Sequence, residues 1–491
     1  MGPLLLLRTT RTARTLAAAG GAVLLLCSAA PAPLIAQGTP GAAASPQAGA
    51  IARTYQPAAD RLIGAALRDS AAYQRLQELV DTFGPRFSGT ASLERAIDWA
   101  LAEMKKDGLQ NVRGERVMVP HWVRGAESAT LVKPRRQRLH MLGLGGSVGT
   151  PPQGVTAEVL VVTSFDDLTR RAAEARGRIV LFDVPFTTYG ETVRYRRDGA
   201  SAAAKVGAVA SLIRSVTPHS LQTPHTGGMV YDSTVARRIP HAALTVEDAM
   251  LLHRLQDAGE RPVVTLTMGA RMLPDVPSRN VVAEVVGAER PDEVVVLGGH
   301  IDSWDVGQGA MDDGGGSVAA WEAVRLIKEL GLRPRRTVRV VLWTNEENGL
   351  RGGRGYRDAH AADVDKHVLA IESDAGVFRP TGFGFVGSDS GLAVARQVGA
   401  LLKRIGADSV ARGEGGADIS PLTELGVPGM GLQVDGTRYF WYHHTDADML
   451  DKLDPADVAR CVATMAVMAY VVADLPDRLP RGASPATSPT R

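Results

Sequence analysis

The sequence predicts an α/β protein with a mixed, mostly parallel sheet covered by helices and with an inserted β-rich domain. From residue 278 onward, short and almost wholly apolar strands alternate with amphipathic helices, which is typical of a sheet buried on both faces. Between 121 and 273, short β-like runs separated by glycine, proline and a few helical stretches replace that alternation. The 491 residues are too many for one ordinary domain, and an apolar content of 45% suffices for sizeable cores.

The first 36 residues have the order of a secretory signal: three arginines, an apolar run from Leu16 to Cys27, and then small residues. The apolar run has about twelve residues, fewer than the roughly 20 that cross a membrane. We therefore expect cleavage after Ala36, a secreted or periplasmic protein and no stable membrane partner, although an uncleaved anchor stays an alternative. Residues 37–50 are a spacer of small residues without a core-forming pattern.

Residues 51–120 are expected to be the N-terminal part of the main domain. Helical patterns at 58–84 and 92–108 each end at a glycine, and a strand pattern at 111–120 ends at Pro120. The inserted domain at 121–273 follows, with strands expected at 128–134, 157–162, 177–185, 208–215 and 263–272.

The main domain is expected to resume at 274–478. A last long helix begins after Asp454, which is placed to cap it, and has Pro455 at its first position. The tail at 479–491 is expected to be disordered. The strands predicted before that helix lie at 278–287, 292–299, 336–344 and 367–374, and the helices at 315–331 and 391–406.

Net charge and cysteine content argue against a nucleic-acid-binding protein and against a fold stabilised by disulfides. The formal net charge of +2 gives no support for a nucleic-acid partner. Removal of the signal leaves Cys461 as the one cysteine, so no internal disulfide can form and packing or metal must supply stability. Cys461 lies in the apolar run of the last helix, and we expect it to be a buried core residue.

Acidic and imidazole side chains follow three of the expected strands at their carboxyl ends, and a late loop adds more. Taken one at a time, these sets have ordinary explanations as solvated pairs, turns or core histidines. Taken together they indicate a site, because in an open α/β sheet the carboxyl ends of the strands meet at one edge. The residues are His300, Asp302, Asp312, Asp313, Glu346, Glu347, Glu372, Asp374, His443, His444, Asp446 and Asp448.

So many carboxylates in one place would repel one another unless a positive charge lay between them. Carboxylates with neutral imidazole and without thiolate suit Zn²⁺, Mn²⁺ or Co²⁺. Two ions about 3.5–4 Å apart, sharing one carboxylate, would explain the convergence.

Five sequence blocks carry a resemblance to a known family. H-x-D, D-D-G-G-G, E-E-x-G-x-x-G, E-S-D and H-x-x-x-D follow one another in this order, and the pattern resembles the M28 metallopeptidases, which use paired zinc ions. The stretch GGHIDSWDVGQGAMDDGGG (298–316) is similar to a carboxypeptidase branch of that family, and the likeness extends from about residue 60 to 475. The resemblance implies a zinc exopeptidase-like fold with a PA-like insert, two Zn²⁺ ions per chain, a short peptide substrate and a possible homodimer.

The resemblance also implies the metal ligands. His300 and Asp374 would bind one zinc ion, and Glu347 and His444 would bind the other. Asp312 would bridge the two ions.

Two further roles follow from the same resemblance. Glu346 would be the general base that takes a proton from the attacking water, and Asp302 would orient a ligand histidine by a hydrogen bond. His443 is the alternative to His444 as a ligand, and the H-x-x-x-D spacing to Asp448 favours His444.

The function expected from these residues is that of an exported di-zinc exopeptidase that hydrolyses short peptides, in particular dipeptides with free ends. The first alternative is a broad M28 aminopeptidase that releases N-terminal residues, and the second is a metal-free receptor or binding protein on the same fold. The sequence does not show which arginine or carboxylate anchors a substrate terminus. Histidines of the insert are expected to be structural, although PHTGG (224–228) could approach the site.

Overall fold

The computed structural model describes residues 46–481. The expected signal, the spacer up to residue 45 and the tail from 482 lie outside these residues. Residues 46–50, expected to belong to the spacer, form the start of the first helix. At the other end, Leu479 is buried, and Arg481 donates hydrogen bonds to the carbonyl groups of Val364 and His367.

The sheet of the main domain has eight strands. Its central pairs β12–β11, β11–β13 and β13–β16 are parallel, and antiparallel pairs adjoin them. The order is β1 (Gln110–Val123), β10 (Arg271–Val285), β12 (Arg336–Trp343), β11 (Arg290–His300), β13 (His367–Glu372), β16 (Gly429–Val434), β14 (Pro380–Val386) and β15 (Ser409–Arg412).

A second eight-stranded sheet is formed between Glu127 and Met268. The pairs β5–β6, β6–β7 and β7–β8 are parallel, and the other pairs of the sheet are antiparallel. The order is β3 (Gln137–Leu139), β2 (Glu127–Lys133), β9 (Val263–Met268), β5 (Val155–Val162), β6 (Ile179–Phe182), β7 (Ala210–Arg214), β8 (His241–Leu244) and β4 (Met141–Gly143).

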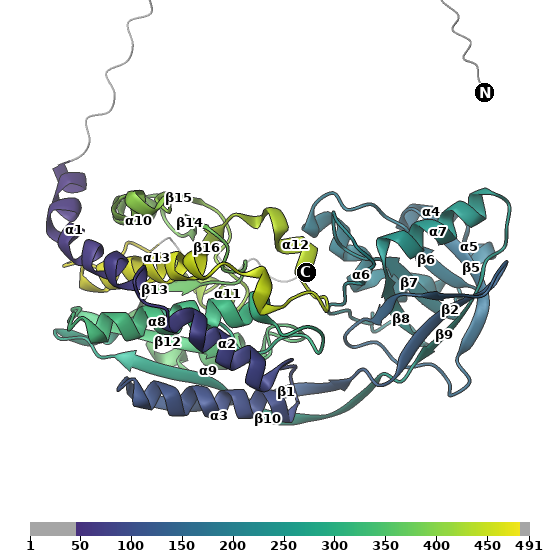
Figure 1. The fold of residues 1–491 in the computed structure, drawn as a ribbon, viewed down its shortest axis with the longest axis horizontal. Coiled ribbons are helices and arrows are strands. Elements are labelled where there is room, and N and C mark those ends of the chain that lie inside the picture. The colour runs from purple at the N-terminus through teal and green to yellow at the C-terminus, as the bar shows by residue number, and fades with distance from the viewer. Residues whose placement is uncertain (1–45, 482–491) are drawn as a thin grey trace, which may run out of the picture. The chain divides into compact units, whose positions relative to one another are not determined.

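Helices cover both sheets (Figure 1). The α-helices of the main domain are α1 (Pro46–Ala66), α2 (Ala71–Phe83), α3 (Ala91–Lys106), α8 (Gly315–Glu329), α9 (Arg351–Ala359), α10 (Asp389–Gly399), α11 (Ser420–Thr423), α12 (Tyr439–Tyr442) and α13 (Pro455–Asp474). Those beside the second sheet are α4 (Phe165–Arg170), α5 (Ala172–Ala175), α6 (Tyr189–Lys205) and α7 (Val246–Asp257).

Strand β11 shows why the main sheet is buried on both faces. Successive side chains of a strand point to opposite faces. Val295 and Leu297 therefore join the core formed with α1, α8 and α13, which lie together in Figure 1. Val294 and Val296 join the smaller core on the side of α9 and α11. The near-continuous apolar runs of the sequence follow from this double burial.

Helix α13 is a core helix. Oδ1 of Asp454 accepts a hydrogen bond from the N–H of Ala456 at 2.8 Å, so Asp454 caps the helix as expected. Among the described residues this is the one helix long and apolar enough to cross a membrane, but 83% of its apolar window is buried inside the protein. Cys461 is fully buried within it, as expected.

The predicted fold class is confirmed, with differences in detail. The helical pattern at 58–84 divides into α1 and α2, because Oδ1 of Asp69 accepts the N–H of Ala71 and starts a new helix there. The few helical stretches expected in the β-rich segment are present as α4–α7. Its limits at 121 and 273 stay a prediction.

Candidate metal centre

Three parallel neighbours, β12, β11 and β13, end at the same edge of the main sheet. His300 is the last residue of β11, Glu346 and Glu347 follow β12, and Asp374 follows β13. The loop after β11 returns to this edge and delivers Asp312 just before α8. His443 and His444 follow α12. The structure therefore brings together all five residues expected to bind metal.

The two oxygens of Asp312 face two different groups of side chains. Oδ1 lies 3.3 Å from Nε2 of His300, which is also 3.3 Å from Oδ1 of Asp374. Oδ2 lies 3.3 Å from Nε2 of His444, which is also 3.1 Å from Oε2 of Glu347. Asp312 is thus the one side chain that the two groups share, the geometry of a carboxylate that bridges two cations.

These residues fit a pair of zinc ions. Ligands about 2.0–2.2 Å from a tetrahedral zinc ion stand roughly 3.3–3.5 Å apart, close to the separations found here. Nε2 of His300, Oδ2 of Asp312 and Oε1 of Glu347 are buried without a hydrogen-bond partner among the described residues. Buried polar atoms without partners are rare, and a cation in each of the two groups would satisfy them.

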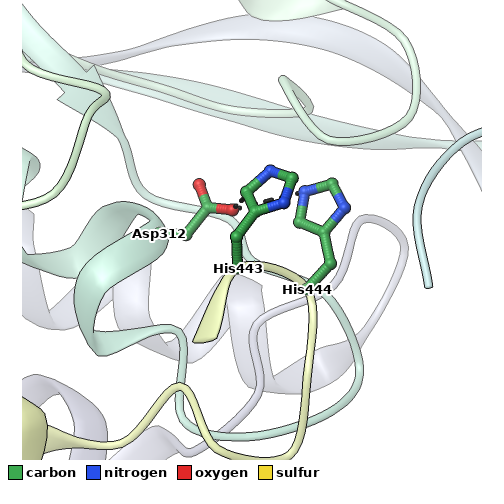
Figure 2. A group of neighbouring side chains, drawn as sticks. All are labelled: Asp312, His443 and His444. Carbon is green, nitrogen blue, oxygen red and sulfur yellow. Dashed lines mark ion pairs between the residues drawn. The ribbon is translucent and has the colours of Figure 1, made fainter. Parts of the chain in front are cut away.

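Both histidines of the late loop face Asp312 (Figure 2). Nε2 of His443 lies 3.6 Å from Oδ2 of Asp312, farther than Nε2 of His444, and its ring stacks on that of His444. Only His444 of the two also pairs with Glu347. Burial lowers the pKa of both rings, so both are neutral and able to act as ligands near neutral pH. The distances favour His444.

Burial dominates the electrostatics of the acidic groups. It raises the pKa of Glu346 well above its usual range, and the charge of Asp374 adds to the effect. It likewise raises the pKa of Glu347, with a contribution from Asp312. Burial alone would raise the pKa of Asp312 too, but the imidazoles of His300 and His444 hold it well below its usual range.

Asp302 holds the glutamates rather than the histidine. Its carboxylate accepts the backbone N–H groups of Glu346 at 3.1 Å and of Glu347 at 3.4 Å. Nδ1 of His300 lies 2.9 Å from the backbone carbonyl of Asp302 and 3.8 Å from the carboxylate. The orientation of His300 expected from Asp302 therefore comes from its main chain, because the side chain is engaged with the loop after β12.

Two other aspartates fix the backbone around Asp312. Asp448 accepts the N–H groups of Ala310, Met311 and Asp312. Asp313 accepts the N–H of His300 and that of Gly316 at the start of α8, so its role is structural.

Three residues beside the motifs behave as follows. Asp446 is exposed and takes no part in the cluster. Asn345 adopts a positive φ of 65°, which asparagine tolerates, and donates from Nδ2 to Oγ of Ser88. Both carboxylate oxygens of Asp418 are buried without a hydrogen-bond partner in the part of the chain that the structure describes.

A cavity of about 790 Å³ adjoins the cluster. Residues of the main domain and residues of the segment expected as an insert both line it. From that segment come Tyr189 and Arg196, both on α6, which carry no sequence signal that could have identified them. The stretch PHTGG does approach the site, since the N–H of Thr226 donates to the carbonyl of His444.

Comparison with known proteins gives one family. The description "Peptidase family M28" matches residues 280–469. The curated Carboxypeptidase Q of Mus musculus is 48% identical over 430 residues, 87% of this chain and 91% of that protein. The Carboxypeptidase Q of Homo sapiens is 50% identical over 409 residues, 83% of this chain and 86% of that protein.

Solved structures agree in fold. The crystal structure of a peptidase M28 precursor from Shewanella amazonensis is 36% identical, with a TM-score of 0.84 over 87% of this chain and 98% of that one. BSAP, described as a zinc aminopeptidase from Bacillus subtilis, is 21% identical, with a TM-score of 0.62 over 81% of this chain and 93% of that one.

Proposed function

The chain belongs to peptidase family M28, and from this premise we propose that it is an exported di-zinc exopeptidase that hydrolyses dipeptides with free ends. The observation that carries the proposal is the pair of side-chain groups joined by Asp312 beside the large cavity. The similarity to Carboxypeptidase Q over most of both chains supports a carboxypeptidase-like activity. Export rests on the signal pattern of the sequence, and a homodimer rests on the family resemblance alone.

His300 and Asp374 would hold one zinc ion, and Glu347 and His444 would hold the other. Asp312 would bind both ions. Once bound, the ions lower the pKa of a water molecule, polarise the scissile carbonyl and stabilise the charge that develops on its oxygen. The pKa values of Glu347 and Asp374 are raised, so bound cations would stabilise their ionised forms. The neutral state of His444 leaves Nε2 free to bind metal.

Glu346 would act as the general base. It faces the cavity, and its backbone N–H is fixed by Asp302. The carboxylate takes a proton from the attacking water and delivers it to the leaving amine. Burial and neighbouring acids raise the pKa of Glu346, which makes it a stronger base toward water once bound cations favour its ionised form.

The contribution of α6 to the cavity supports a preference for short substrates. Tyr189 and Arg196 stand on the same wall as His443 and His444. A cavity closed on this side by the inserted segment would exclude long chains.

A broad aminopeptidase is the second candidate, and the acidic lining of the cavity favours it. Glu372 and Glu414 line the cavity in addition to Glu346 and the carboxylates of the metal cluster, and could receive an α-amine. The two candidates differ in whether the substrate also needs a free carboxylate.

The test compares one dipeptide in its free, N-acetylated and C-amidated forms. Blocking either end should lower kcat/KM at least about tenfold, because a buried polar group of the protein then lacks its partner. Equal rates for the free and C-amidated forms would support the aminopeptidase. Equal rates for the free and N-acetylated forms would indicate an ordinary carboxypeptidase, and rapid hydrolysis of decapeptides would contradict a closed cavity.

A further inference from the structure

Acidic side chains greatly outnumber basic ones in the lining of the cavity. Arg196 is the one lysine or arginine among the described residues that line it. Six carboxylates share the lining, namely Asp312, Glu346, Glu347, Glu372, Asp374 and Glu414. All these acids come from the main domain, whereas Arg196 comes from α6 beside the second sheet.

Arg196 is a buried cation without a counter-charge. Its residue is 7% exposed, and no ion pair joins it to a carboxylate in the part of the chain that the structure describes. Nη1 donates to the carbonyl of Thr226 at 3.3 Å and Nη2 to the hydroxyl of Tyr189 at 2.7 Å, while Nε has no partner. A buried charge without an opposite charge is costly to maintain, which suggests that an anion completes the site.

The guanidinium lies one imidazole ring away from the metal cluster. Nη1 of Arg196 is 3.3 Å from Nδ1 of His444, and Nε2 of the same ring faces Asp312 and Glu347. If Nε2 binds a cation, Nδ1 carries the proton and accepts no hydrogen bond from Arg196. The guanidinium is then left with neutral partners only.

We propose that Arg196, with the hydroxyl of Tyr189, binds the α-carboxylate of the substrate. One residue of extended chain spans about 3.5 Å, so a carboxylate one residue beyond a carbonyl held at the cluster would reach a group beside His444. The inference rests on the proposed function and deepens it, because it names the side chain that makes a free C-terminus a requirement.

Local packing supports an anchor built for this purpose. The hydroxyl of Tyr189 accepts the bond from Arg196 and keeps its own proton to donate, so a carboxylate could receive bonds from both groups. A Cβ on Gly227 would lie 2.4 Å from Cζ of Arg196, so glycine at this position lets the guanidinium pack against the PHTGG backbone. The φ of +134° at Gly227 also favours glycine.

The test is Arg196→Gln, assayed with alanyl-leucine and with its C-terminal amide. The wild type should prefer the free dipeptide by about 10- to 100-fold in kcat/KM, the typical effect of one charge-assisted contact. Arg196→Gln should lower kcat/KM for the free dipeptide by that factor and leave the amide within about twofold of wild type. The preference should thus fall to near one, and Arg196→Lys should retain part of it.

Arg197→Gln is the matched control. Arg197 is the next residue of α6, is exposed and pairs with Asp198, so this variant makes the same charge change outside the cavity. It should leave both rates unchanged. Inhibition gives a second readout: N-acetyl-leucine, which keeps a carboxylate one residue beyond a carbonyl, should inhibit the wild type more strongly than N-acetyl-leucinamide, and Arg196→Gln should remove that difference.

The outcomes separate this inference from the proposed function. If the wild type treats free and amidated dipeptides alike, the dipeptidase proposal fails and the anchor fails with it. If the wild type prefers the free dipeptide and Arg196→Gln keeps that preference, the proposed function stands and Arg196 is not the anchor. An equal loss on both substrates would assign Arg196 a structural role only, and a folding defect would be recognised by the same equal loss together with a lower melting temperature.

Discussion

At the scale of single residues, Asp312 links the two halves of the candidate centre. Each of its oxygens faces a separate histidine at 3.3 Å, and each of those histidines faces a further carboxylate. Asp448 holds the backbone before and at Asp312 through three N–H groups. A shift of this segment would therefore disturb both groups at once.

Separate substitution of the two adjacent glutamates by glutamine should distinguish the general base from the metal ligand. Glu346→Gln should keep both metal ions and lose about 10²–10⁴-fold in turnover, because it removes only proton transfer. Glu347→Gln should first lose metal, since Oε2 of Glu347 pairs with His444. The measurements are the turnover and the zinc content of the two purified variants. If Glu346→Gln lacked metal and Glu347→Gln kept both ions, Glu346 would be the ligand and Glu347 the base.

A buried histidine far from the metal cluster in sequence should make stability depend on pH. Burial lowers the pKa of His241 to about 4, and Nε2 of this residue bonds the carbonyl of Arg196. The folded protein therefore resists protonation of His241 that the unfolded chain accepts below about pH 6.5. The contribution of His241 to stability is fully present above that pH and is lost as the pH falls toward 4, by up to about 3 kcal/mol.

Denaturant midpoints at pH 7 and pH 4.5 test this expectation. His241→Gln should show a smaller loss of stability between the two pH values than the wild type, because glutamine does not titrate. His140→Gln, at an exposed position of the same segment, is the control and should follow the wild type. The same loss in His241→Gln as in the wild type would contradict the assignment.

At the scale of elements, a buried arginine joins Asp448 in holding the loop between β11 and α8 to the rest of the fold. Arg86 lies between α2 and α3 and donates to the carbonyls of Ile301, Gln308 and Gly309. Burial lowers the pKa of Arg86 to about 10, so it stays charged at neutral pH. The segment between the N-terminal helices α2 and α3 thus helps to position the loop that carries Asp312.

The cap of α13 offers a test at the same scale. Asp454→Ala removes the acceptor for the N–H of Ala456 and should destabilise the protein by about 1 kcal/mol. Asp451→Ala, at an exposed neighbouring position without a role in that cap, should change the stability much less. Thermal unfolding of both variants measures the difference, and equal melting temperatures would show that the cap contributes nothing measurable.

At the scale of the whole molecule, two sheets with separate cores supply one cavity. The main sheet provides the acidic groups and the histidines, and α6 beside the second sheet provides Tyr189 and Arg196. The contact between them passes through the late loop, where Arg196 lies against His444. The two sides of the cavity therefore meet through residues more than 200 positions apart in the sequence.

Removal of metal should affect stability as well as activity. Cations bound between buried carboxylates stabilise only the folded state, so chelation should abolish hydrolysis and lower the melting temperature. Added zinc should restore both. A melting temperature that is the same before and after chelation, with metal removal verified by elemental analysis, would contradict a metal centre built from these residues.

The sequence by itself determined the fold class, the main helices and strands, and the residues of the candidate metal centre. This was possible because hydrophobic periodicity is a local property, and because His300, Glu347 and Asp374 lie at strand ends that parallel pairing must bring to one edge. His444 could be chosen over His443 from its spacing to Asp448, and the distances to Asp312 and Glu347 agree with that choice.

Only the tertiary structure decided which residues surround that centre. Arg86, Tyr189 and Arg196 belong to no motif, and their roles depend on contacts with partners far along the chain. The hydrogen bond from His300 to the main chain of Asp302, rather than to its carboxylate, likewise depends on how the loop after β12 folds back. Local patterns specify elements, whereas the walls of a cavity arise when separate elements pack, and no local pattern records that packing.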